Sequence, residues 1–362
     1  MTNRMHVLLG LGCALLLESF TSLTFAAQSS VSLRGQAVAK EMFVRIGGIE
    51  QWITIEGDNG ENPVVLFLHG GPGDADSPFA DSLYRGWERE FTLVQWDQRG
   101  AGRTYTKNGP SIEPTMTMDR MVQDGIEVAE FLAHHLHKPK IVVVGISWGS
   151  ILGASMVHAR PDLFYAYVGV AQMVNWIENV QASYTRVLEL ARRADDQPAI
   201  ATLTAVGPPP WNAISKWPQF RKWQRAYQAK NVKVGPPNMT RNPAYDSPDE
   251  RAQYDEADDF SFIHFVGLDM SGPLTHVDLS ALGTDFEIPL FIVQGEQDLV
   301  AVPYLARAFL DRLTAPQKEF YLVPGAGHAP SSGGLSLILQ ILREEVRPLI
   351  RKTESRPQPD ER

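Results

Sequence analysis

Ile141-Val142-Val143-Val144-Gly145-Ile146-Ser147-Trp148-Gly149 is the stretch of sequence that decides the fold. An apolar run rich in β-branched residues passes directly into a Gly-x-Ser-x-Gly motif, and a helical pattern follows over residues 150–160. A strand, a sharp turn and a helix expose such a serine, because the small glycines let the chain fold back tightly. The alternative is a serine in an ordinary strand-to-helix turn. We predict that Ser147 is a nucleophile that attacks an ester or amide carbonyl.

Short apolar runs and helical patterns alternate along most of the chain. Continuous apolar runs are typical of strands that are buried on both faces of a parallel sheet. Strands are predicted over residues 43–46, 52–55, 64–68, 92–96, 141–145, 167–170, 290–293 and 320–323. Helices are predicted over residues 118–136, 150–160, 304–313 and 335–350. The sequence therefore predicts an α/β fold with a mostly parallel sheet, helices on both faces, and a first hairpin around Gly47 and Gly48.

The alternation fails between Met173 and Glu287, where the sequence is helical and rich in Trp and Pro. A separate downstream domain would explain this, but the strand pattern resumes at Leu290 as if in the same sheet. We therefore predict an inserted, mostly helical cap over residues 173–287, at the carboxyl ends of the strands where open α/β sheets bind ligands. Residues 28–172 and 288–350 then form the core, and residues 351–362 form a disordered tail.

The first residues have the pattern of an export signal. Arg4 precedes an apolar run from Val7 to Leu17, and small residues follow up to Ala27. This predicts a signal peptide over residues 1–27, a periplasmic or secreted protein, and no permanent membrane span after the signal is removed. The single cysteine, Cys13, lies within that signal, so thiol chemistry, disulfides and cysteine metal sites are excluded.

Composition limits the class of protein further. The chain of 362 residues is 44% apolar and 21% charged, which is ordinary for a globular protein. Its formal net charge is −9, and no basic stripe with interleaved aromatic residues is present. Nucleic acid is therefore excluded as a partner, and a small molecule or a short peptide is expected as the substrate. The sequence does not define the oligomeric state.

A glycine-rich loop after the predicted strand 64–68 supports the interpretation of Ser147. His69-Gly70-Gly71-Pro72-Gly73 can direct a backbone N–H group at a developing oxyanion. The N–H groups of Gly71 and Trp148 would together form the oxyanion hole, because Trp148 follows the nucleophile. A plain turn or a phosphate cradle is the alternative, but the Lys-Ser/Thr of a P-loop does not follow. We predict that His69 has a structural role.

A serine hydroxyl needs a base, and that base needs an acid behind it. Asp298 follows the predicted strand 290–293, and His328 follows the strand 320–323. The order Ser147, Asp298, His328 is the order in which an α/β-hydrolase places its triad, and all three follow strand ends. Glu296 is the rival acid. The predicted chemistry requires no metal and no organic cofactor.

Three motifs resemble the prolyl iminopeptidase-like branch of the α/β-hydrolase superfamily. These are His69-Gly70-Gly71-Pro72-Gly73, Trp96-Asp97-Gln98-Arg99-Gly100-Ala101-Gly102-Arg103 and Gly145-Ile146-Ser147-Trp148-Gly149-Ser150, in the order that the family has them. The similarity covers residues 43–171 and 289–350. It implies an α/β-hydrolase fold, the triad Ser147, Asp298 and His328, and removal of an N-terminal residue, often proline, as the activity.

The predicted cap departs from this family, whose aminopeptidases hold the substrate ammonium with cap glutamates. A desolvated ammonium needs carboxylate partners. Glu178, Glu256, Asp258 and Asp259 could supply them, or could form a solvated acidic face. The aromatic residues Trp211, Trp217, Trp223 and Tyr227 favour a hydrophobic ligand instead. The substrate-binding residues predicted from the cap are Glu178, Trp211, Trp217, Trp223 and Glu256.

Three hypotheses for function follow from these patterns. The first is an aminopeptidase-like hydrolase of small peptides or aminoacyl amides. The second is a carboxylesterase or lactonase that acts on small hydrophobic esters. The third is a binding protein on a hydrolase scaffold, and the complete set of triad and oxyanion residues argues against it. Only the first hypothesis requires carboxylates in the cap that face Ser147.

Overall fold

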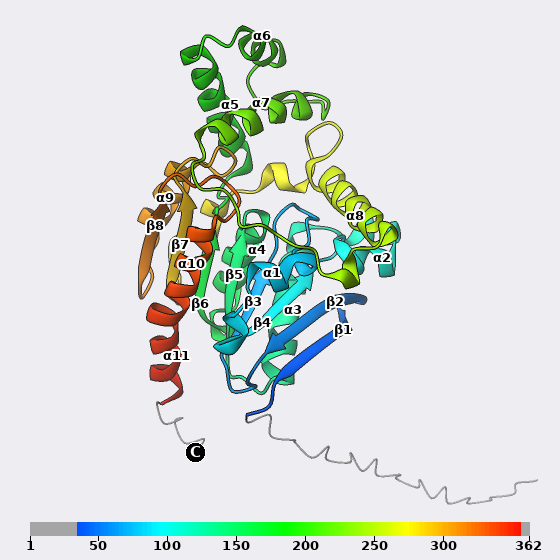
Figure 1. Cartoon of the computed structure of the whole chain (residues 1–362), viewed down its shortest axis with the longest axis vertical. Coiled ribbons are helices and arrows are strands. Elements are labelled where there is room, and N and C mark those ends of the chain that lie inside the picture. Colours follow the sequence, from blue (N-terminus) through cyan, green and yellow to red (C-terminus); the bar gives the residue numbers. More distant parts are fainter. Residues whose placement is uncertain (1–34, 356–362) are drawn as a thin grey trace, which may run out of the picture. The chain divides into compact units, whose positions relative to one another are not determined.

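The computed structural model describes residues 35–355, so the predicted signal peptide over residues 1–27 lies outside the described residues. An eight-stranded sheet forms the centre, in the order β1-β2-β4-β3-β5-β6-β7-β8 (Figure 1). Its strands are β1 (Val38–Ile46), β2 (Ile49–Gly57), β3 (Val64–Leu68), β4 (Thr92–Asp97), β5 (Ile141–Ile146), β6 (Phe164–Val170), β7 (Leu290–Gly295) and β8 (Lys318–Val323). The first three in this order pair antiparallel and the rest pair parallel.

The strand predictions are confirmed, including the hairpin, in which β1 and β2 are joined by Gly47 and Gly48 at φ 55° and 81°. The predicted strand lengths were too short at the hairpin. Strands β1 and β2 each run for nine residues, because alternation of exposed and buried side chains extends them beyond the apolar runs.

Helices cover both faces of the sheet, as predicted. They are α1 (Ala80–Leu83), α2 (Gly102–Asn108), α3 (Met118–His135), α4 (Trp148–Ala159), α5 (Trp176–Arg193), α6 (Gln197–Val206), α7 (Lys216–Asn231), α8 (Pro248–Val266), α9 (Pro303–Arg312), α10 (Ser332–Ile341) and α11 (Arg347–Glu354). Short 3₁₀ turns are η1 (Ser77–Phe79), η2 (Trp87–Arg89), η3 (Pro110–Thr115), η4 (Pro161–Leu163), η5 (Pro243–Tyr245), η6 (Pro273–His276) and η7 (Leu279–Leu282), and a π-helical turn, η8 (Leu342–Val346), joins α10 to α11.

Alternate residues of the central strands belong to two separate apolar clusters. Leu66 and Val143 pack in the cluster that includes α3, α4 and α9. Phe67 and Val144 pack in the cluster that includes α10 and α11. Because successive side chains of a strand point to opposite faces, this division shows that the middle of the sheet is buried on both sides.

Residues between β6 and β7 form four helices, α5 to α8, while β6 and β7 themselves are neighbours in the sheet. Helices α5, α6 and α7 stand above the sheet in Figure 1, and α8 lies beside α2. The sheet is therefore continuous across this 173–287 segment. Within residues 35–355, no helix is long and apolar enough to cross a membrane.

The predicted start of the tail at residue 351 was wrong by four residues. Helix α11 continues to Glu354, whose carboxylate accepts a 2.9 Å hydrogen bond from the Tyr165 hydroxyl. This contact and the buried Ile350 hold the final turn against the sheet. The tail from residue 356 lies outside the described residues.

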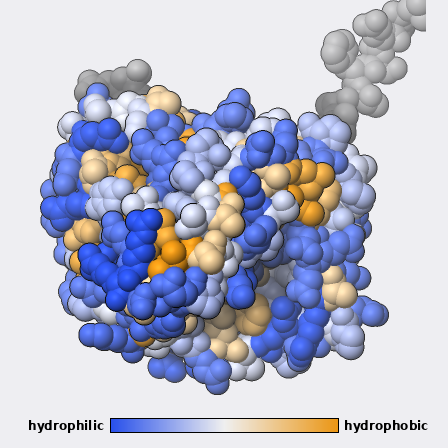
Figure 2. Space-filling view, turned by 90° about the horizontal axis from the view of Figure 1, so that it is seen from above, coloured by the Kyte–Doolittle hydropathy of each residue, from blue (hydrophilic) through white to orange (hydrophobic). Residues whose placement is uncertain are grey.

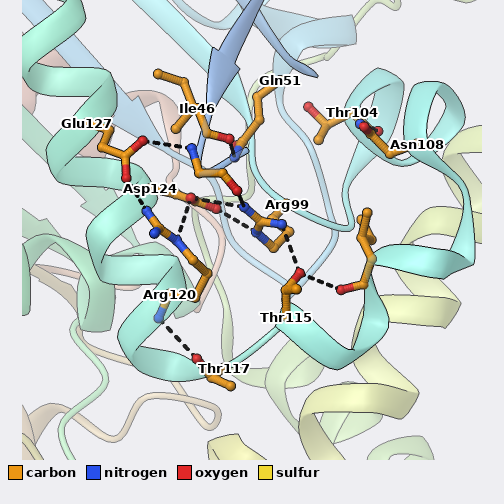
Figure 3. A network of polar contacts seen from close by, with 12 residues as sticks. Ile46, Gln51, Arg99, Thr104, Asn108, Thr115, Thr117, Arg120, Asp124 and Glu127 are labelled. Atoms are coloured by element: carbon orange, nitrogen blue, oxygen red, sulfur yellow. Dashed lines mark hydrogen bonds and ion pairs between the residues drawn. The ribbon is translucent and has the colours of Figure 1, made fainter. Parts of the chain in front are cut away.

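A buried ion pair ties the loop after β4 to the hairpin and to α3 (Figure 3). Arg99 donates two hydrogen bonds to Asp124, at 2.7 and 3.1 Å, and one to the Gly47 carbonyl at 2.9 Å. Its third nitrogen donates to Thr115 at 2.9 Å. Arg120 approaches Asp124 at 2.8 Å from the other side. Since the Arg99–Asp124 pair is fully buried and its donors are satisfied, it fixes the path of the loop.

Candidate active site

Ser147 lies on a strained turn between β5 and α4, with φ 53° and ψ −116°. The two glycines of its motif are required by close packing of backbone on backbone. A Cβ atom on Gly145 would lie 2.5 Å from the carbonyl oxygen of Gly149, and one on Gly149 would lie 2.1 Å from that of Leu68. The residue types of the motif therefore permit a turn that directs the serine side chain away from the sheet.

His328 lies between Ser147 and Asp298. Its Nε2 atom is 2.9 Å from Ser147 Oγ, and its Nδ1 atom is 2.9 Å from Asp298 Oδ2. Asp298 is buried, and its other oxygen accepts hydrogen bonds from the N–H groups of Val300 and Ala301 at 2.7 and 3.0 Å. The carboxylate thus orients the imidazole, which can take the proton of the hydroxyl.

The rival acid Glu296 is directed elsewhere. Its carboxylate accepts a 2.8 Å hydrogen bond from the N–H of Gly325, and this contact lowers its pKa. Glu296 is exposed, whereas Asp298 is buried beside the imidazole. The structure therefore joins Asp298, not Glu296, to His328.

The predicted oxyanion residues Gly71 and Trp148 line the same cavity as Ser147. Trp148 is the first residue of α4, so its N–H belongs to the turn whose N–H groups have no partner within the helix. Gln98 holds the two segments together, because it accepts a 2.8 Å bond from the Trp148 indole and donates one of 3.2 Å to the His69 carbonyl. The glycine loop and the start of α4, which would supply the two predicted N–H groups, are thus held next to each other at the cavity.

His69 has the surroundings of a structural residue. Burial lowers the pKa of His69 to about 4, so the ring is neutral near pH 7. The Gln98 N–H donates to Nε2 at 3.2 Å, and Nδ1 lies 2.9 Å from the Gly70 carbonyl oxygen. A ring protonated at Nδ1 satisfies both contacts. His69 therefore anchors the glycine loop.

A cavity of about 480 Å³ opens above Ser147. Aromatic side chains form much of its wall: Tyr84, Trp148, Trp176, Trp217 and Phe262. Its charged residues are Asp74, Asp76, Asp258 and Asp259, together with Arg221 and Arg225. A larger hollow of about 600 Å³ lies over β1 and β2, but no triad residue lines it. The cavity that contains the triad is the candidate site.

Of the five cap residues predicted to bind substrate, only Trp217 lines this cavity. Glu178 is exposed on the first turn of α5, and the exposed Glu256 accepts a 2.9 Å bond from the Tyr105 hydroxyl. Trp211 is buried in an aromatic cluster with Tyr184 and Phe220. Trp223 packs on the core next to Lys222. The structure does not bring these four residues to the cavity, because composition does not show which face of a helix meets it.

Sequence reasoning missed four charged residues of the cavity. Asp74 and Asp76 follow the glycine loop directly, and that proximity was the available signal. Arg221 and Arg225 share one face of α7 with Trp217, at four-residue spacing. The segment was predicted only as part of a mostly helical cap, without the bounds or the orientation of this helix.

The carboxylates of the cavity repel one another. Both Asp74, which is exposed, and Asp76, which is half-buried, line the cavity. Burial raises the pKa of Asp76 to about 8, and the charges of Asp74 and Asp97 add to this effect. Burial, followed by Asp74 and Asp259, raises the pKa of Asp258 to about 6. A cationic group that enters the cavity would relieve this repulsion.

Comparison with known proteins is consistent with this geometry. A family model described as alpha/beta hydrolase fold matches residues 63–333. This chain therefore belongs to the α/β-hydrolase family. It is 27% identical over 321 residues to a probable aminopeptidase, YbaC, of Bacillus subtilis, covering 86% of this chain and 96% of that protein. It is 39% identical over 99 residues to a proline iminopeptidase of Arabidopsis thaliana, covering 27% of this chain and 23% of that one.

Solved structures show the same fold. The proline iminopeptidase of Mycobacterium smegmatis superposes with a TM-score of 0.61 at 18% identity, over 87% of this chain and all of that one. VinJ superposes with a TM-score of 0.62 at 19% identity, over 86% of this chain and 99% of that one. These structures show the fold alone. The sequence relatives, a probable aminopeptidase and a proline iminopeptidase, are what make this chain a prolyl iminopeptidase-like α/β-hydrolase.

Proposed function

We propose that this hydrolase removes the N-terminal residue of small peptides or aminoacyl amides, with Ser147 as the nucleophile. The observation that carries the proposal is the position of His328, 2.9 Å from both Ser147 Oγ and Asp298 Oδ2, at a cavity lined by four carboxylates. Hydrolase activity follows from the family. Our proposal goes beyond this activity in two respects, the role of Ser147 as the nucleophile and the specificity for a free N-terminus.

In the proposed reaction, His328 Nε2 takes the proton of Ser147 as Oγ attacks the scissile carbonyl carbon. The N–H groups of Gly71 and Trp148 stabilise the oxyanion of the tetrahedral intermediate. His328 then gives its proton to the leaving nitrogen, and an acyl-enzyme remains. A water molecule, deprotonated by His328, attacks this ester and releases the acid and the free serine.

The free amine of the substrate is bound by the acidic wall of the cavity. Asp258 and Asp259 come from α8, and Asp74 comes from the oxyanion loop. An ammonium group taken out of water requires charged or hydrogen-bonding partners, and these carboxylates provide them. The pKa of Asp258, raised to about 6, leaves it mostly ionised at neutral pH. The cap glutamates of the family are thus replaced here by aspartates.

Hydrolysis of proline and alanine anilides, beside short-chain aryl esters, tests the proposal in the purified protein and in Ser147→Ala. We expect anilide turnover by the native protein and loss of about 10⁴-fold or more in the variant. Equal rates in the two proteins would show that Ser147 is not the nucleophile. Turnover of esters alone would exclude the aminopeptidase specificity.

A second candidate function is a carboxylesterase or lactonase. Trp176 and Trp217 stack at 5.6 Å between ring centroids and line the cavity with Phe262, so a hydrophobic acyl group would fit against them. The same triad would cleave such an ester. The carboxylates of Asp74, Asp258 and Asp259 favour the aminopeptidase, because a neutral ester has no positive charge to pair with them.

The third hypothesis, a binding protein without catalysis, receives no support from the site. A scaffold used only for binding has no need of an imidazole held within 2.9 Å of both a buried carboxylate and a serine hydroxyl. The strained backbone of Ser147 would likewise cost stability without a function.

A further inference from the structure

One face of α7 presents two cations to the cavity. Trp217, Arg221, Gln224 and Arg225 all line it, and their spacing of three or four residues puts them on one side of the helix. Gln224 is buried and donates to the Leu299 carbonyl at 2.6 Å, next to Asp298. This contact fixes the helix rotation, so the arginines are directed at the site by the packing of α7.

Neither arginine is neutralised by the protein. Among residues 35–355, no carboxylate lies within ion-pair distance of Arg221 or Arg225, and Arg221 donates only to Gln224. Burial, with the charge of Arg225, lowers the pKa of Arg221 to about 10, so it is cationic near pH 7. Arg221 is half-buried and Arg225 is exposed, so an anionic group that enters the cavity can pair with both guanidinium groups without displacing a protein carboxylate.

The two poles of charge lie on opposite sides of the reaction centre. The C-terminal end of helix α7 packs over the His328 loop, since a Cβ atom on Gly327 would lie 3.3 Å from the Gln228 side chain. Helix α8 packs over the oxyanion loop, since a Cβ atom on Gly73 would lie 2.8 Å from the Cα atom of Asp258. The arginines are therefore on the side of His328, and the aspartates are on the side of Gly71.

We propose that Arg221 and Arg225 bind the C-terminal carboxylate of the substrate, so that dipeptides and tripeptides with a free C-terminus are preferred. This inference rests on the proposed aminopeptidase function. His328 protonates the leaving nitrogen, so the leaving amino acid or dipeptide lies on its side of Ser147, where the arginines are. In one short peptide, the N-terminal ammonium group can then bind the aspartates while the C-terminal carboxylate binds the arginines.

The test compares a dipeptide, prolylalanine, with its C-terminal amide, prolylalaninamide. The two differ only in the charge of the leaving group, so the ratio of their kcat/KM values isolates its recognition from folding and from the triad. We expect the native protein to favour the free acid by about tenfold or more, mainly through KM. Arg225→Gln should bring the ratio close to one.

Lys222→Gln is the matched control, because Lys222 is an exposed cation on the same helix whose ammonium lies 5.1 Å from the Trp223 ring, outside the cavity. Its ratio should stay at the native value. Equal kcat/KM for acid and amide in the native protein, or a ratio unchanged in Arg225→Gln, would overturn the inference and leave the aminopeptidase function intact. Failure to cleave either peptide, with esters still cleaved, would reject both.

Discussion

The loops at the edge of the sheet and the helices above them contribute to the same cavity in different ways. Ser147, Asp298 and His328 each follow a strand, and their side chains meet within 2.9 Å. The helices α5, α7 and α8 supply the rest of the wall, and there the four-residue spacing of each helix decides which side chains face inward. Under the proposed function, the loops that follow the strands supply the catalytic groups. The rotation of each helix determines which of its side chains meet the ligand.

This division explains why the two regions respond differently to substitution. A side chain that follows a strand end is positioned by the backbone of the sheet, so under the proposed function its replacement removes one catalytic group without changing the rest of the cavity. A side chain on an inserted helix acts through charge and shape in the cavity, so its replacement alters affinity for some substrates and not for others. The predictions below test this difference.

After the loss of Ser147 itself, the largest effect is expected at the buried acid of the triad. Asp298→Asn should lower kcat by about 10³ to 10⁴-fold, because the amide no longer stabilises the imidazolium or its tautomer. Glu296→Gln, two residues away and exposed, should lower kcat by less than about tenfold. Steady-state kinetics with an anilide and an aryl ester measure both. Similar losses in the two variants would mean that Glu296 shares the role of the acid.

The residues at the edge of the sheet could be predicted from the local sequence. Gly145 and Gly149 have no room for a Cβ atom, so the turn itself requires glycine at these positions. The sequence shows this turn as a motif, and it shows that Ser147 and His328 each follow an apolar run. Order along the chain then placed Asp298 and His328 at one edge. The lengths of β1 and β2 and the end of α11 were not predicted, because they depend on pairing and packing with other segments of the chain.

The helical wall was not predictable in the same way. The helical nature of residues 173–287 was evident, but Glu256 and Asp258 are two residues apart on α8, and only Asp258 faces the cavity. Helix geometry separates their directions by about 200°. Packing of α8 on α2 and on the glycine loop decides which of the two faces the cavity. The rotation of α8 about its own axis cannot be predicted from the pattern of a single sequence.

Asp258 and Glu256 therefore form a natural pair of variants. Asp258→Asn should raise KM for an alanine anilide by about 10- to 30-fold, because a charge-assisted contact to the substrate ammonium is lost. It should leave KM for an aryl ester without an amine nearly unchanged. Glu256→Gln should alter neither, since its carboxylate binds Tyr105 outside the cavity. Equal effects on both substrates would mean that Asp258 supports the fold and not amine binding.

The pH dependence of kcat/KM distinguishes amine binding by the helices from catalysis by the triad, and it does so in the native protein. The pKa of Asp258 is about 6, so this carboxyl becomes neutral as the pH falls below 6 and loses its attraction for an ammonium group. The ratio of kcat/KM for the anilide to that for the ester should therefore decrease by about threefold to tenfold between pH 7 and pH 5. Titration of the triad cancels in this ratio. The decrease should be absent in Asp258→Asn, and its persistence there would assign it to another group.

The smallest effect concerns stability. Asp76, whose pKa is raised to about 8 in the folded protein, takes up a proton on folding between about pH 4 and pH 8. Its contribution is complete at low pH and is lost as the pH rises through 8, so the free energy of unfolding should fall over that range. Asp76→Asn should stabilise the protein by about 1–2 kcal/mol at pH 9 and have little effect at pH 4, as measured by urea unfolding. The charge of Asp76 then opposes folding, as expected of a group kept in the cavity for its ligand. A variant that is destabilised equally at both pH values would instead show a structural role for this carboxyl in the oxyanion loop.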